Sequence, residues 1–425
     1  MSVLKAPLAL AALMALFVSS SVLASDAPVL LRPDATRGAG PAPSLAAADW
    51  APLTVDAGLL AGGPERLALE PLPGRVFEAS VTGVERRGPG DLVWRGQVVD
   101  REGSQVVLTL HRGFVVGAIF LLDDVYEIGT SADGLQVASR LDSNRFPPCA
   151  LGSSAGPPRP AAVPAGGPTA QRAALDEPDE IDVMILYTPQ ARDAAGGVAQ
   201  IETTAQAAVD MANTAYANSD MIARIQLVHT ELAARNDSGN ISSDLNWTAT
   251  NATVATLRNT YAADMVSLIV ENGAGACGVG YLLGNQDAAN FGPSAFQVTA
   301  RSCAVGNLTY AHEHGHNMGL NHDPANAGSP GSLYQPDAYG HFHNGQYRTV
   351  MSYSTECSSG CTRHPYFSNP AVSFMALPTG ILNQRDNHRT ANLTAPFVAN
   401  WRTAVTIFAD GFESGDTSAW TLTEP

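Results

Sequence analysis

One segment, AHEHGHNMGLNHD over residues 311–323, constrains the fold of this chain more than any other, because it holds four of the ten histidines. If the segment is helical, His312 and His316 lie four residues apart on one face. Two imidazoles one turn apart can bind a single metal ion, and the carboxylate of Glu313 can reach a water molecule on that ion. The segment therefore predicts a helix that carries a metal centre, with Glu313 as general base.

Gly319 and His322 complete the predicted site. A helix that continued past Gly319 would point His322 away from the metal, but glycine tolerates the left-handed conformation that ends a helix and turns the chain. His322 can then return as a third nitrogen ligand, which leaves the fourth position of a zinc ion open for water, as in catalytic sites. A closed structural zinc site is the alternative, and Glu313 and the lack of a fourth nearby cysteine or histidine argue against it. His314 lies on another face and is left out.

The composition limits the partners of the chain. Its 425 residues leave room for two or three domains, and 45% of them are hydrophobic, which is enough for a sizeable core. The formal net charge of −16 offers no basic surface to meet phosphate groups, so we expect no nucleic-acid partner. We expect the mature protein to be a monomer.

Residues 1–24 have the pattern of a secretory signal peptide. Lys5 gives a positive start, residues 8–18 form an unbroken apolar run, and the small residues VLA precede Ser25. An uncleaved membrane anchor is the alternative, but the run is short for a span and three serines follow it. We therefore expect a secreted, extracellular protein without membrane contact in its mature form, exported by the Sec route and through the periplasm if the source is Gram-negative.

The rest of the chain divides into four parts by composition. Residues 25–150 are expected to form a small antiparallel β-rich domain, since short Val- and Ile-rich strands alternate with turns from about residue 75 to residue 130. Residues 151–179 are rich in Pro, Ala and Gly, which predicts a flexible linker. Residues 180–403 form the predicted catalytic domain. The acidic tail, residues 404–425, is expected to be solvated, and a calcium-binding loop there is an alternative without support in the sequence.

The predicted catalytic domain reads as α/β. IDVMILYT (181–188), ARIQLVHT (223–230) and MVSLIVE (265–271) have the composition of buried strands, and segments with helical spacing lie between them. Strands that alternate with helices imply a mostly parallel, twisted sheet with helical crossovers. GVGYLLG (278–284) and AFQVTARS (295–302) are two further candidate strands before the histidine segment.

The string HEHGHNMGLNH resembles the signature of the metzincin zinc metallopeptidases. This resemblance implies a metzincin-like α/β (α+β) fold with an active-site helix and a methionine turn beneath the metal, for which RTVMSYS fits with Met351 as the turn residue. Tyr353 matches a tyrosine of astacin-like and serralysin-like members that ligates zinc or binds the tetrahedral intermediate. Asp323 instead matches the reprolysin pattern, so a packed turn aromatic remains the alternative for Tyr353.

The longer stretch over residues 181–401 is similar to the bacterial peptidyl-Asp metallopeptidases, a reprolysin-like group. The similarity rests on IDVMILYTPQAR, CGVGYLLGN, SCAVGNLTYAHEHGHNMGLNHD and TVMSYS. It implies an endopeptidase with one catalytic Zn²⁺ that cuts protein substrates on the amino side of aspartate and, less often, glutamate. We expect the substrate to add antiparallel to an edge strand near residues 278–284.

A pocket for an aspartate side chain needs a cation, and arginine matches a carboxylate with two parallel donors. In metzincins the segment after the methionine turn helps to form this pocket, which favours Arg363 here, with Arg348 and Arg385 as alternatives. A bridge between Cys357 and Cys361 would stiffen the loop, and Cys277 would then pair with Cys303. Two other pairings of these four cysteines stay open.

The fifth cysteine, Cys149, follows two prolines that force an extended approach. An extended segment can lie along a substrate cleft, and a thiolate at its end is a good zinc ligand. We therefore predict that residues 25–150 are an inhibitory propeptide in which Cys149 occupies the open zinc position, as in the cysteine switch of several metzincin proforms. A free or intermolecularly paired cysteine is the alternative.

Two other functions compete with a protease. One is a secreted non-catalytic adhesion or binding protein that keeps zinc for stability, and the other is a zinc hydrolase that acts on a small amide. The complete ligand set with Glu313 argues against the first. The β-rich domain and the linker suit a protease precursor better than the second.

Overall fold

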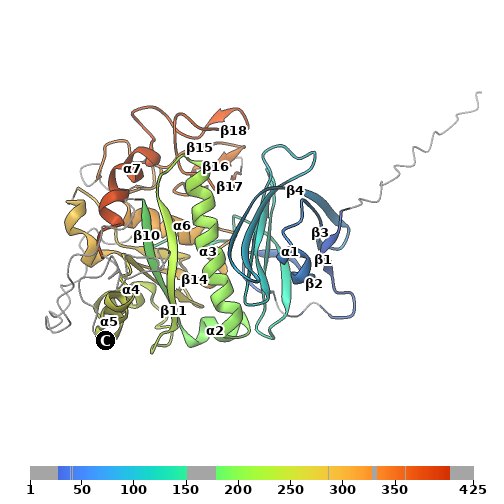
Figure 1. Ribbon diagram of the computed structural model, residues 1–425. Helices are drawn as coiled ribbons and strands as arrows, with labels where there is room; N and C mark the ends of the chain where they lie inside the picture. Colours follow the sequence, from blue (N-terminus) through green and yellow to red (C-terminus); the bar gives the residue numbers. More distant parts are fainter. Residues whose placement is uncertain are drawn as a thin grey trace, which may run out of the picture.

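The computed structural model describes residues 27–38, 40, 42–150, 179–285, 287–327, 333–358 and 360–402. The predicted signal peptide, the tail and nearly all of the linker lie outside these residues. The described part forms a β-rich N-terminal domain that packs against an α/β domain (Figure 1), as the sequence predicts. Within it, no helix has the length and apolar character needed to cross a membrane.

The N-terminal domain is a closed barrel of nine strands in the order β1-β2-β9-β8-β7-β6-β5-β4-β3. Neighbouring strands pair antiparallel except β1 and β3, whose parallel pairing closes the barrel. The strands begin much earlier in the chain than the residue 75 expected from the pattern. Their bounds, with the short helix α1 (Ala57–Ala61), are β1 Val29–Pro33, β2 Ala47–Val55, β3 Arg66–Leu72, β4 Arg75–Gly88, β5 Asp91–Val98, β6 Gln105–His111, β7 Phe114–Phe120, β8 Val125–Thr130 and β9 Gln136–Leu141.

Strands β5 to β7 are apolar on both faces because each face covers a different core. Trp94 and Leu108 point into the barrel, whereas Val93 and Val107 next to them belong to the core of the α/β domain. Alternate side chains of a strand lie on opposite faces, so a strand between two cores reads as a continuous hydrophobic run. The nearly continuous hydrophobic run QVVLTLH of β6 is explained by the burial of both faces of this strand.

The α/β domain is built on a five-stranded sheet in the order β11-β10-β12-β14-β13. The first four strands run parallel, and the edge strand β13 runs antiparallel to β14. The strands of this sheet are β10 Glu180–Tyr187, β11 Arg224–Leu232, β12 Met265–Val270, β13 Gly278–Gly280 and β14 Phe296–Ala300. The helices are α2 Pro189–Ala195, α3 Val198–Asn218, α4 Ile241–Thr250, α5 Ala252–Thr260, α6 Thr309–Asn317 and α7 Asn387–Val398.

The remaining elements are short. They are the strands β15 Phe342–His343, β16 Tyr347–Arg348, β17 Thr362–Arg363, β18 Ser373–Phe374 and β19 Leu377–Pro378, and the 3₁₀ turns Ala288–Asn290, Gly292–Ser294, Arg301–Cys303 and Ser354–Glu356. The structure contains the disulfides Cys277–Cys303 and Cys357–Cys361, which selects one of the pairings left open by the sequence. Cys149 is free and buried.

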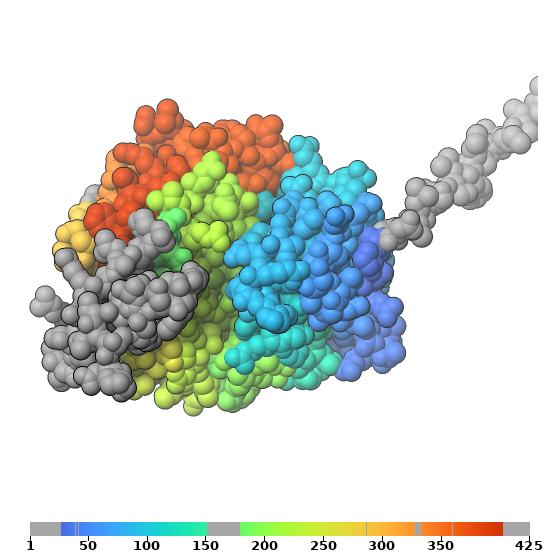
Figure 2. All heavy atoms as spheres, viewed as in Figure 1, coloured from blue at the N-terminus to red at the C-terminus, as the bar shows by residue number. Residues whose placement is uncertain are grey.

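Helix α3 lies between the sheet and the barrel (Figure 1). The barrel contacts one polar side of this helix: Arg87 forms an ion pair with Asp210 at 2.8 Å, and Thr109 donates a hydrogen bond to the same carboxylate at 2.6 Å. Thr203 donates to the His111 carbonyl at 2.8 Å. Figure 2 shows the atoms of the barrel, in blue, against those of α3 along a continuous boundary. Polar contacts therefore hold much of this side of the interface.

Candidate metal centre and active site

Helix α6 carries His312, Glu313 and His316, and all three side chains are buried. The helix ends at Asn317, and Gly319 adopts a positive φ of 90°, which an L side chain rarely adopts. A Cβ atom at Gly319 would also lie 3.2 Å from the carbonyl oxygen of Leu283. The chain turns at this glycine and brings His322 back to the helix, as the spacing predicts.

The three imidazoles meet at their Nε2 atoms. His322 Nε2 lies 3.1 Å from His312 Nε2 and 3.0 Å from His316 Nε2. Each Nδ1 atom faces a backbone carbonyl: Val350 for His312 at 2.9 Å, Leu320 for His316 at 2.9 Å and Asn326 for His322 at 3.1 Å. Since a carbonyl only accepts, each Nδ1 carries the proton and each Nε2 presents a lone pair. Three converging lone pairs repel one another unless a cation lies between them, so this donor set fits a metal ion.

Burial keeps these rings neutral, which is the form that binds a metal. It lowers the pKa of His316 to about 3 and that of His322 to about 4, and the charge of His322 adds to the effect on His316. Burial, and then the two neighbouring imidazoles, also lower the pKa of His312. All three imidazoles are therefore uncharged at neutral pH, with the proton on Nδ1 and the lone pair on Nε2.

Glu313 lies in a space that two glycines leave open. A Cβ atom at Gly278 would lie 2.5 Å from Glu313 Oε1, and one at Gly280 would lie 3.3 Å from Oε2. Neither carboxylate oxygen has a hydrogen-bond partner among the described residues. Burial raises the pKa of Glu313 to about 8, although the thiol of Cys149, the charge of Arg363 and the N–H of Gly280 oppose the rise. The sequence prediction did not include this role of Gly278 and Gly280 in making room for Glu313. The only signal for it in the sequence is the Gly-x-Gly spacing of these two residues.

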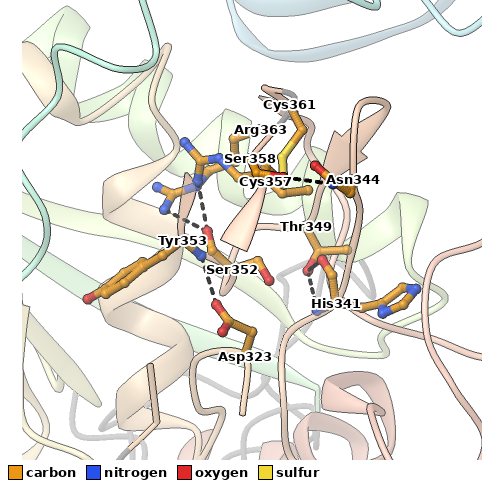
Figure 3. The surroundings of a disulfide bond; sticks show 11 residues. Asp323, His341, Asn344, Thr349, Ser352, Tyr353, Cys357, Ser358, Cys361 and Arg363 are labelled. Atoms are coloured by element: carbon orange, nitrogen blue, oxygen red, sulfur yellow. Dashed lines mark hydrogen bonds between the residues drawn. A yellow bond between two sulfur atoms is a disulfide. The ribbon is translucent and has the colours of Figure 1, made fainter. Parts of the chain in front are cut away.

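Met351 and Tyr353 come from the loop below the helix. The Sδ atom of Met351 lies 2.8 Å from where a Cβ atom would stand at Gly315, so the methionine packs directly against α6. The hydroxyl of Tyr353 lies 3.1 Å from His322 Nε2, and its backbone N–H donates to Asp323 Oδ2 at 3.0 Å (Figure 3). Burial, and then nearby Cys149, raise the pKa of Tyr353, so its hydroxyl keeps its proton.

Cys149 reaches the same space from the N-terminal domain. Its Sγ atom lies within 4.8 Å of ligand atoms of His312 and Glu313. The Cys277 N–H donates to the Pro148 carbonyl at 3.1 Å, and the Ala150 N–H donates to the Gly278 carbonyl at 2.8 Å. The segment around Cys149 therefore lies along the edge strand β13 and follows its direction.

The arginines near the methionine turn differ in their surroundings. Arg363 and Arg348 are buried beside the centre and donate to the carbonyl of Ser352. Arg385 lies elsewhere, with Nη1 3.1 Å from His341 and its guanidinium over the ring of Phe342. Arg348 and Arg363, unlike Arg385, therefore share a backbone acceptor in the methionine turn.

His314 stays outside the centre. Its Nε2 atom lies 3.1 Å from Ser267 Oγ on β12, and its ring packs against Tyr310. This histidine belongs to the contact between α6 and the sheet. The centre thus joins three imidazoles, a buried carboxylate, a phenol and a thiol from distant parts of the chain, an arrangement that fits metal-assisted hydrolysis.

Comparison with known proteins agrees with this class. The family model Reprolysin_5, of the metallo-peptidase family M12, matches residues 177–368. The peptidyl-Asp metalloendopeptidase of Xanthomonas campestris pv. campestris is 31% identical over 367 residues, which cover 82% of this chain and 84% of that protein. The protein of the same name from Stenotrophomonas maltophilia R551-3 is 28% identical over 359 residues, 78% of this chain and 82% of the relative.

Among solved structures, metalloproteinase-II from Bacteroides fragilis is similar over 65% of this chain and 90% of that chain. The TM-score is 0.36 and the identity is 12%. This class of protein is a zinc metalloendopeptidase, as the histidine motif, the geometry of the metal centre and the similarity to the peptidyl-Asp metalloendopeptidases together show. The chain belongs to the reprolysin-like family of these peptidyl-Asp metalloendopeptidases.

Proposed function

We propose that this protein is a secreted zinc endopeptidase, made as an inactive precursor, that cuts protein chains on the amino side of aspartate and less often of glutamate. One observation carries the proposal: the Nε2 atoms of His312, His316 and His322 converge beside the buried carboxylate of Glu313. The aspartate preference is supported by the names of the relatives. Secretion is supported by the signal pattern of residues 1–24.

In this proposal the three histidines hold one zinc ion. When bound, zinc supplies the positive charge that polarises a water molecule and the carbonyl of the scissile bond. Glu313 accepts the proton of the attacking water and passes it to the leaving nitrogen. The protonated hydroxyl of Tyr353, 3.1 Å from His322 Nε2, donates to the oxygen that becomes negative. Met351 supports the helix that carries two of the ligands.

The barrel acts as the propeptide in this proposal. Cys149 Sγ, within 4.8 Å of ligand atoms of His312 and Glu313, would take the place of the attacking water, and its neighbours lie along the edge strand β13, where a substrate is expected to bind. The inhibitory segment follows the direction of β13, whereas the expected substrate runs antiparallel to it. A chain bound in the reverse direction blocks the cleft without presenting its own peptide bond for cleavage.

A non-catalytic zinc protein is the alternative, and nothing in the site favours it. A purely structural zinc site would need neither a buried carboxylate beside the ligands nor an edge strand along which a peptide segment lies. The relatives that cover most of the chain carry the names of peptidases.

The test is a digest of a denatured protein mixture by the processed enzyme, read by mass spectrometry. We expect most new amino termini to begin with aspartate and fewer with glutamate, because the residue after the cut would select the site. A chelator should stop cleavage, and zinc should restore it. Cuts without acidic preference would reject the aspartate preference alone. No cleavage by zinc-loaded, processed protein would favour the binding-protein alternative.

A further inference from the structure

Two buried arginines lie side by side under the active site. Arg348 on β16 and Arg363 on β17 face each other in the register of the two strands, with 2% and 5% of their surfaces exposed. Arg348 Nη1 donates to the Ser352 carbonyl at 2.8 Å, and Arg363 Nη2 donates to the same oxygen at 3.2 Å. Arg363 Nη1 also donates to the Asn307 carbonyl at 2.8 Å. The backbone thus fixes both guanidinium groups, as Figure 3 shows for Arg363 and Ser352.

Nothing in the described part of the chain neutralises these two charges through an ion pair. The partners of both groups are neutral carbonyls, and the Nε atom of each arginine is buried without a hydrogen-bond partner. The nearby carboxylate of Asp323 is occupied by the N–H of Tyr353 and the amide of Asn326. Buried charges are normally paired, because removing an ion from water is costly. Two adjacent unpaired guanidinium groups are therefore suited to bind an anion.

The pair lies next to the reacting groups. Ser352, which both arginines contact, stands between Met351 and Tyr353 in the methionine turn. Glu313 and Cys149 lie within electrostatic reach of the Arg363 charge. Arg363 also lines a small cavity that continues towards the barrel. Gly306, Asn307 and Thr362 line this cavity from the α/β domain. The N-terminal domain, which includes the carboxylate of Asp123, lines the other side with Asp123, Val125, Leu141, Ser143 and Phe146.

We infer that Arg348 and Arg363 together form the subsite that binds the side-chain carboxylate of the residue after the scissile bond. This inference rests on the proposed function, cleavage on the amino side of acidic residues. Guanidinium groups give planar, paired donors that match a carboxylate. Because the backbone holds both groups in place, the depth of the subsite is fixed. A short aspartate side chain fits such a subsite differently from a longer glutamate.

The test compares kcat/KM for three peptides that differ only at the residue after the cut: Asp, Asn or Glu. The processed enzyme is measured as wild type, R348Q, R363Q and R385Q. Each of the first two substitutions should lower the Asp-to-Asn ratio by about 10- to 100-fold, as expected for a lost hydrogen bond between charged groups. R385Q is the matched control and should keep the ratio. A ratio within one protein is independent of the fraction that is folded.

Each outcome separates the inference from the proposed function. A wild-type preference for Asp that survives in both R348Q and R363Q overturns the inference and leaves the proposed function intact. Equal cleavage of the Asp and Asn peptides by wild type rejects the proposed aspartate preference itself. If the glutamine variants do not fold, R348K and R363K give the ratio, because lysine keeps a donor for the backbone. Their single ammonium lacks the paired donors, so a reduced ratio is still expected.

Discussion

Burial determines what each side chain of the active site can do. The same loss of water that lowers the pKa of His316 to about 3 raises that of Glu313 to about 8, because it disfavours the charged form of both. The imidazoles are thereby kept as neutral ligands, and the carboxylate gains affinity for a proton. In its ionised form such a carboxylate is a stronger base than an exposed one, which suits it to accept a proton from water.

Replacing Glu313 by glutamine tests this role, since the change keeps the size and removes the proton acceptor. We expect turnover to fall by about 10²- to 10⁴-fold, the usual contribution of a general base. Zinc content should stay unchanged because the three histidines are intact. Peptide hydrolysis and metal analysis of the same sample measure the two properties. Glu231→Gln, on the far edge strand β11, is the control, and normal turnover in E313Q would show that another group acts as base.

The sequence predicts the histidine ligands and Glu313 because they lie within eleven positions and follow helix and turn geometry. His322 depends on one conformation, that of Gly319, which the residue type itself favours. The partnership of Arg348 and Arg363 could not be predicted in this way. It depends on the pairing of two-residue strands whose composition carries no periodic signal.

At the scale of elements, the edge strand β13 organises the cleft. Its glycines make room for Glu313, and its outer edge pairs with the segment around Cys149. The alternation of strands and helices was visible in the sequence from residue 181 to residue 271. Closure of the barrel was not visible in the sequence, because it requires the parallel pairing of β1 with β3, two segments that lie apart in the chain.

Cys149→Ser tests the inhibitory segment. The exchange of sulfur for a hydroxyl removes the strong metal ligand and keeps the backbone pairing with β13, so we expect the uncut precursor to become prematurely active on a short peptide. Pro148→Ala is the control, because its side chain is exposed and its carbonyl still accepts from Cys277. Hydrolysis by purified precursor, with its intact length verified by mass spectrometry, is the measurement. If C149S is as silent as wild type, the cysteine switch is wrong.

At the scale of the whole molecule, the barrel and the α/β domain share buried and half-buried carboxylates. Glu127 on β8 is half-buried at the interface and accepts a hydrogen bond from the Gly306 N–H at 2.7 Å. Burial raises its pKa from 4.5 to about 7, although the Gly306 N–H and the charge of Arg301 oppose the rise. Burial also raises the pKa of Asp210, against the effect of Arg87. Docking of the barrel is thus linked to proton uptake.

The linkage predicts how pH affects release of the barrel after the linker is cut. Docking raises the pKa of Glu127. The favourable contribution of Glu127 to the free energy of docking is therefore complete below about pH 4.5 and is lost as the pH rises towards 7. Between these two limits the free energy of docking changes by on the order of 3 kcal/mol at most. We expect the cut precursor to hold its barrel more tightly at pH 5 than at pH 8, measured by size-exclusion chromatography. Glu127→Gln should weaken this dependence, and an unchanged pH profile would contradict it.

Helix α3 forms hydrogen bonds to the barrel through Thr203, Asp210, Thr214 and Asn218. Departure of the barrel would expose this polar stripe to solvent, and with it the apolar side chains that pack against Val93, Val107 and Phe120 of the barrel. The free peptidase would therefore gain a partly hydrophobic surface, which favours self-association once the inhibitor is lost.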